Sequence, residues 1–155
     1  MADGWDPNAR GIGFLVGRGR LERVIASVPN ARYLLAESRR HLASSALLAD
    51  VDVSLAFLAA YDAARQALTA ILMAQGLRVT GGDGGHAVLL DAVRPQFPTQ
   101  RAILQEFDWM RQTRNATQYP DFEHPTATPA DVAEARTAAA SIVDLADRWL
   151  AALPS

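Results

Sequence analysis

Apolar residues recur every three or four positions over four long segments of the chain, which is the spacing of amphipathic helices. The pattern predicts helices at about residues 31–48, 52–75, 100–119 and 129–152, with a shorter helix at 86–94. No segment shows the sustained alternation of a half-buried strand. The sequence therefore predicts an all-α fold, an up-and-down bundle of four main helices with short N-terminal and connecting helices.

Several helix boundaries are marked by capping residues. Asn30 is suited to cap the helix expected at 31–48, and Thr99 the helix expected at 100–119. Either Asp50 or Asp52 is suited to cap the helix expected at 52–75. Gly76 suits the left-handed position after a helix. The strongest start signal is Thr128 to Asp131, which combines a capping threonine, a proline in the first turn and an acidic third residue.

The rest of the chain is expected to form an arm and short connections. Residues 1–20 are predicted to be an N-terminal arm, and residues 21–153 a single helical-bundle domain. The glycine-rich segment 11–17 lacks the strand and the βαβ pattern that a dinucleotide-binding turn requires. Its apolar residues, Phe14, Leu15 and Val16, are expected to pack on the body or on a partner. Residues 21–28 are predicted to form a short helical turn, and residues 77–85 a flexible loop.

Hydrogen-bonding groups gather at the end of the helix expected at 100–119. Its apolar stripe consists of Ile103, Phe107 and Met110. Arg114 occupies the next position on that stripe, and a neighbouring stripe carries Arg111, Asn115 and Tyr119. This arrangement indicates a candidate site. A structural interpretation remains open, because an arginine in a last turn also complements the helix dipole and can lay its stem on apolar surface.

The helix expected at 52–75 carries a second polar feature. One of its stripes begins with apolar residues and then becomes polar at Asp62 and Arg65. These two residues are spaced to form an exposed ion pair along the helix. The same substitution of polar for apolar residues also suits one wall of a groove that faces the Arg114 helix.

Composition excludes several classes of function. Aromatic residues make up only 7% of the chain, which favours close-packed helices. The net charge is −2 and there is no lysine, so any anion site must be local. There are no cysteines, and the three histidines share no ligand spacing, so we predict neither a metal site nor a cofactor. Without a signal sequence or an apolar run near 18 residues, the protein is expected to be soluble, cytoplasmic and free of the membrane.

Five short motifs occur along the chain in a characteristic order. They are GRGRLERV at 17–24, YDAARQAL at 61–68, GLR at 76–78, GGH at 84–86 and RNATQYP at 114–120. Together with the order of helices, they resemble the HEPN superfamily. The resemblance implies a helical bundle that often dimerises and is frequently encoded beside a minimal nucleotidyltransferase as a toxin–antitoxin pair. In active members an Arg-x4-6-His motif at the end of a helix forms a metal-independent endoribonuclease site across the dimer cleft.

The resemblance assigns candidate roles to residues of this chain. Arg114 matches the motif arginine and Asn115 the polar residue that follows it, whereas Tyr119 stands where many family nucleases have histidine. An unperturbed tyrosine, with a pKa near 10, is a poor base at neutral pH. His124 is therefore a candidate substitute base. The residues predicted to bind ligand around this centre are Arg111, Gln118, Asp62, Arg65 and His124.

The candidate site around Arg114 and Tyr119 allows three interpretations of the function. In the first, a homodimer joins Arg114 and Tyr119 of both chains in one groove that cuts RNA. In the second, the groove binds a nucleotide, RNA or a nucleotidyltransferase partner without cleavage. In the third, the bundle is purely structural and Arg114 is buried against a carboxylate such as Asp62. We favour a toxin-like protein of the HEPN type and leave its catalysis open.

Overall fold

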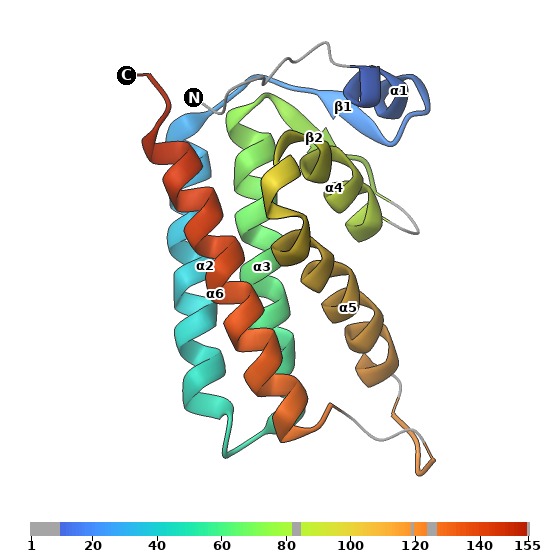
Figure 1. Ribbon diagram of the computed structural model, residues 1–155, viewed down its shortest axis with the longest axis vertical. Coiled ribbons are helices and arrows are strands. Elements are labelled where there is room, and N and C mark those ends of the chain that lie inside the picture. The colour runs from blue at the N-terminus through green and yellow to red at the C-terminus, as the bar shows by residue number, and fades with distance from the viewer. Residues whose placement is uncertain (1–9, 82–84, 119, 124–126, 155) are drawn as a thin grey trace.

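The computed structural model describes residues 10–81, 85–118, 120–123 and 127–154. Four long helices lie side by side, each antiparallel to the one before it (Figure 1). They are α2 (Val28–Leu48), α3 (Val53–Ala74), α5 (Arg101–Gln118) and α6 (Pro129–Ala151). The shorter elements are α1 (Arg10–Gly17), β1 (Leu21–Arg23), β2 (Leu77–Val79), α4 (Gly85–Val93) and two 3-10 turns at Arg94–Gln96 and Pro98–Gln100. The predicted all-α, up-and-down bundle is confirmed.

Helix α3 forms the centre of the bundle, in contact with α2, α4, α5 and α6. Its fully buried alanines allow these neighbours to approach closely; they include Ala56, Ala60, Ala63, Ala64, Ala67 and Ala70. By length and composition α3 also resembles a membrane-spanning helix, although 61% of its most apolar window is buried inside the protein. A core helix of a folded domain has the same properties, so α3 alone is weak evidence for a membrane span.

Two serines on the apolar face of α2 join that helix to α3. Ser38 and Ser45 are fully buried. Ser38 donates a hydrogen bond to the carbonyl oxygen of Ala63 at 2.7 Å, and Ser45 donates one to that of Ala56 at 2.6 Å. Because each hydroxyl has a partner, these polar groups occupy an apolar stripe without the cost of an unpaired buried donor.

A small antiparallel sheet replaces the turn expected at 21–28 and part of the loop expected at 77–85. Leu21 pairs with Val79, and Arg23 with Leu77. Both predictions were wrong because strands of three residues are too short to show alternation. Leu21 and Leu77 are buried and fix the sheet to the core.

The link from α3 into β2 requires glycine. Gly76 has a φ of 74°, and a Cβ atom at this position would lie 2.8 Å from the carbonyl oxygen of Val24. The left-handed conformation predicted for Gly76 is therefore confirmed. The same close approach allows the amide of Val24 to donate a hydrogen bond to the carbonyl of Gly76 at 2.9 Å.

The helix starts agree in part with the sequence. Asp52 caps α3, and Thr128 forms the expected capping box with Asp131. Helix α2 begins earlier than expected, because Ser27 and not Asn30 is its N-cap and Pro29 lies in its first turn. Thr99 lies in a 3-10 turn that runs directly into α5 and is not the N-cap of that helix.

Candidate functional site

The candidate site is organised around Tyr61, a fully buried side chain of α3. Its ring stacks on Phe107 of α5, with centroids 5.4 Å apart and an interplanar angle of 13°. Its hydroxyl lies 2.5 Å from Nδ1 of His86, in the first turn of α4. The guanidinium carbon of Arg114, on α5, lies 5.8 Å from the centre of the Tyr61 ring. Three helices therefore bring one arginine, one tyrosine and one histidine together.

The apolar stripe of α5 places Arg114 in this arrangement. Phe107 and Met110 are fully buried against the core. Arg114, one turn further along the same stripe, is thus directed at the bundle and becomes half-buried. An arginine over an aromatic face is stabilised by about 0.5–2 kcal/mol, depending on its solvation.

The carboxylates near Arg114 are paired with other arginines. Asp62 forms an ion pair with Arg65 at 3.2 Å, and Asp108 forms one with Arg111 at 2.8 Å. Among the residues that the structure describes, Arg114 has no carboxylate partner. The burial of Arg114 against Asp62, expected if the bundle is purely structural, is not observed.

His86 is half-buried in a positively charged environment. Burial lowers the pKa of His86 below its usual value, and Arg65, Arg114 and Arg111 lower the pKa further, while Asp62 opposes them. The cation is disfavoured both by desolvation and by like charge. His86 is therefore predominantly neutral at pH 7.

The phenol of Tyr61 remains protonated at neutral pH. Burial raises the pKa of Tyr61 to about 12, against the opposing effect of Arg114, Arg65 and Arg111. Two neutral groups thus share the 2.5 Å hydrogen bond. The tautomer of His86 decides which of them donates: Tyr61 donates when Nε2 carries the ring proton, and His86 donates when Nδ1 carries it.

His86 lines a cleft of about 630 Å³. His86, Arg65 and Thr69 form its polar side near the site, and Leu72 and Leu89 contribute apolar wall. Residues of the sheet and residues that follow β1, including the exposed Ile25, also line the cleft. The volume lies within the range of small-molecule sites.

A sequence model of the HEPN domain matches residues 31–149. This segment includes Tyr61, His86 and Arg114, together with all four long helices over most of their length. The chain belongs to the HEPN family. No curated protein and no solved structure shows significant similarity to this HEPN protein.

Not all the residues predicted for the HEPN site lie in one place within the described parts of the chain. Asp62, Arg65, Arg111 and Arg114 all influence the pKa of Tyr61 or His86 and surround that pair. Asn115 is exposed on α5. Tyr119, His124 and the side chain of Gln118 lie outside the described residues. Within the described ranges there is also no cluster of three or more potential metal-binding side chains.

Tyr61 and His86 were not predicted from the sequence to be site residues. Tyr61 lies on a stripe that is typical of core positions, and a histidine at a helix start is usually a surface or capping residue. The available signal was that both lie in motifs that carry the resemblance to the HEPN superfamily, YDAARQAL and GGH. Their contact depends on the packing of α4 against α3, which the sequence pattern does not specify.

Proposed function

We propose that this HEPN protein binds RNA phosphates through the Arg114 cluster and cleaves RNA without a metal ion, as the toxin-like member of a toxin–antitoxin pair. The observation that supports this most is the position of Arg114. Its half-buried guanidinium lies over Tyr61, beside His86, without a carboxylate partner in the described chain.

The local charge favours an anionic ligand. Three arginines, Arg65, Arg111 and Arg114, face two carboxylates, Asp62 and Asp108, so the cluster carries one net positive charge when His86 is neutral. The whole chain carries −2. Arginine binds phosphate through charge-assisted hydrogen bonds that are often bidentate. Arg114, which has no carboxylate partner among the described residues, is the group that a phosphate would engage first.

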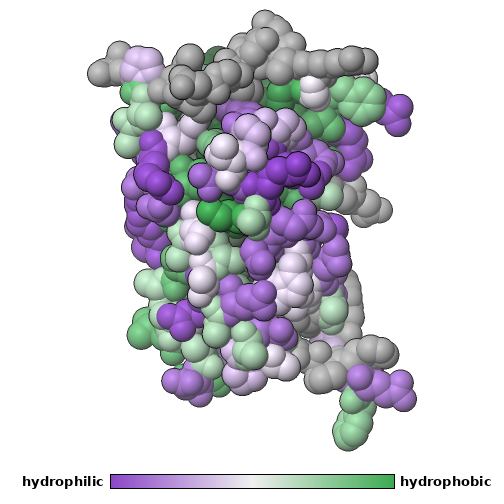
Figure 2. All heavy atoms as spheres, viewed as in Figure 1, coloured by the Kyte–Doolittle hydropathy of each residue, from purple (hydrophilic) through white to green (hydrophobic). Residues whose placement is uncertain are grey.

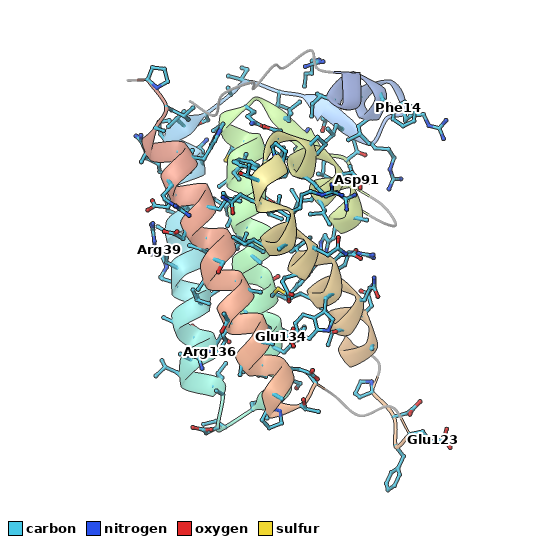
Figure 3. All side chains as sticks on the ribbon, viewed as in Figure 1. Phe14, Arg39, Asp91, Glu123, Glu134 and Arg136 are labelled. Atoms are coloured by element: carbon cyan, nitrogen blue, oxygen red, sulfur yellow. The ribbon has the colours of Figure 1, made fainter. Side chains whose placement is uncertain are left out.

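The proposal includes the homodimer and the nucleotidyltransferase partner that the resemblance to the HEPN superfamily implies. A homodimer would place Arg114, Asn115 and Tyr119 of both chains in one groove, and a nucleotidyltransferase would act as the antitoxin in the cytoplasm. The exposure of Asn115, next to Arg114, leaves its amide available to a phosphate or a base. Phe14 projects from α1 away from the bundle and is 64% exposed, which makes it available to a partner (Figure 3).

The test is induced expression of the wild type, Arg114→Ala and Tyr119→Phe, with growth and cellular RNA integrity as readouts. Arg101→Ala is a matched control, because Arg101 is exposed at the opposite end of α5. We expect growth arrest and cleaved RNA with the wild type and with Arg101→Ala, and neither with Arg114→Ala. Cleavage that persists in Arg114→Ala would reject the proposal.

A non-catalytic function is the second candidate, and one feature favours it. Tyr119 stands where many family nucleases carry histidine. In this alternative the same cluster binds RNA, a nucleotide or a nucleotidyltransferase without cutting. It predicts intact RNA and normal growth on expression of a folded protein, with RNA or partner binding that is lost in Arg114→Ala.

A further inference from the structure

We propose that His86 is a catalytic residue of this site, which takes the proton of the attacking 2′-hydroxyl while Tyr61 holds its imidazole in place. The proposal rests on the ribonuclease function proposed above. It adds a proton acceptor that lies outside the segment from Arg114 to Tyr119.

Geometry is the first support for this role. Nδ1 of His86 is engaged by the hydroxyl of Tyr61 at 2.5 Å, and the two rings lie 5.6 Å apart. Tyr61 is itself fixed, because it is fully buried and stacked on Phe107. A histidine that is held at one nitrogen by an immobile partner presents its other nitrogen in a defined direction. Arg114 contacts the ring of the same tyrosine. The proposed base, His86, and the phosphate-binding residue, Arg114, are therefore both positioned by Tyr61.

Access is the second support. His86 lines the 630 Å³ cleft together with Arg65 and Thr69. The apolar lining residues Leu72 and Leu89 suit a nucleobase, and the polar lining residues His86 and Arg65 suit the ribose and phosphate. A nucleoside in the cleft would bring its 2′-hydroxyl to His86 and its 3′-phosphate to Arg65, the arginine of the cluster that lines the cleft.

The protonation state is consistent with a base. Within the described chain, the charged groups that influence the pKa of His86 are Asp62 and Arg65 on α3, and Arg111 and Arg114 on α5. Their net positive charge and the burial of the ring keep His86 neutral at pH 7. In the tautomer with hydrogen on Nδ1, the ring donates to Tyr61 and its Nε2 is free to accept a proton.

The reaction balances without an added reagent. Nε2 of His86 takes the 2′-hydroxyl proton, the 2′-oxygen forms a bond to phosphorus, and the bond from phosphorus to the 5′-oxygen breaks. A water protonates the departing 5′-oxygen, and the proton on His86 neutralises the resulting hydroxide. The products are a 2′,3′-cyclic phosphate and a 5′-hydroxyl, and Arg114 stabilises the charge on the phosphorane.

Chemical rescue tests the role of His86 directly. The full-length His86→Ala protein is compared with the wild type for cleavage of a single-stranded RNA in excess EDTA, with and without free imidazole. We expect a loss of cleavage rate of about 10²–10⁴-fold, unchanged affinity for the RNA, and partial recovery in imidazole that follows the fraction of neutral imidazole as pH changes. His41→Ala is the matched control, because His41 lies on α2 and is not among the residues that line the cleft.

The possible results separate this inference from the proposed function. Cleavage by His86→Ala at the wild-type rate overturns the role of His86 and leaves the function of Arg114 standing. A loss of cleavage without imidazole rescue, with the fold and RNA affinity preserved, assigns His86 a structural role and also overturns the inference. If the wild type binds RNA and does not cleave it, both proposals of catalysis fail.

Discussion

Replacing Tyr61 with phenylalanine separates the two kinds of contact that this tyrosine makes. Phenylalanine keeps the ring that stacks on Phe107 and lies beneath Arg114, and removes the hydroxyl that is 2.5 Å from His86. A single hydrogen bond contributes about 0.5–1.5 kcal/mol net to the free energy of unfolding. We expect a loss at the lower end of that range, because His86 lines the cleft and water can replace the hydroxyl.

Tyr61→Leu provides the contrast, because it removes the ring as well. The aromatic pair with Phe107 contributes about 0.5–1.5 kcal/mol, and the contact with Arg114 a further ~0.5–2 kcal/mol. Urea denaturation of the purified variants measures both losses. Tyr61→Leu should be less stable than Tyr61→Phe by at least about 1 kcal/mol.

A double-mutant cycle isolates the contact with Arg114. Arg114→Gln is introduced into the wild type, Tyr61→Phe and Tyr61→Leu, and the coupling free energy is calculated for each pair. We expect Arg114→Gln to cost the same in the wild type and in Tyr61→Phe, and less in Tyr61→Leu. An equal cost in all three backgrounds, or a Tyr61→Phe variant as unstable as Tyr61→Leu, would refute the placement of Arg114 over the tyrosine ring.

Three further predictions concern stability. Gly76→Ala should lower the free energy of unfolding by at least about 1–2 kcal/mol, because the φ of Gly76 is 74° and the new Cβ would lie 2.8 Å from the carbonyl oxygen of Val24. Urea denaturation measures the loss. Gly81→Ala is the control, because a Cβ atom at Gly81 would have no neighbouring atom within 4 Å. Thermal stability should fall as pH rises from about 10 towards 12, because burial raises the pKa of Tyr61 to about 12 and the folded state favours the protonated phenol. Thermal stability should also fall below about pH 6.5, because the folded state lowers the pKa of His86. In melting curves, Tyr61→Phe should lose less stability at alkaline pH, and His86→Gln should lose less at acid pH. Losses equal to those of the wild type would contradict these assignments.

The long helices were predictable because their signals are local and repeated. The apolar period of α3 runs over 22 residues, and Thr128 with Asp131 forms a capping box that can be read from four consecutive residues. Gly76 was also predictable, because glycine is the usual residue after a helix that ends in a left-handed turn. In these segments local preference and tertiary packing favour the same conformation.

The elements that were not predicted depend on contacts between distant residues. Strands β1 and β2 have three residues each and are stabilised by pairing across more than 50 positions of sequence. Tyr61 and His86 are 25 positions apart, and neither position shows by its own pattern that the two side chains touch. Arg114 was identified because it interrupts an apolar stripe, which is a local signal. The face of α5 and α6 in Figure 2 carries hydrophilic and hydrophobic side chains interspersed.

The central claim is that Arg114 binds the phosphate of an RNA that this protein cleaves. The most direct measurement is cleavage of a labelled single-stranded RNA by purified wild type, Arg114→Ala and Arg101→Ala in excess EDTA. We predict cleavage to a 2′,3′-cyclic phosphate by the wild type and by Arg101→Ala, and none by folded Arg114→Ala. Equal cleavage by all three proteins, or intact RNA with the wild type, would contradict the account.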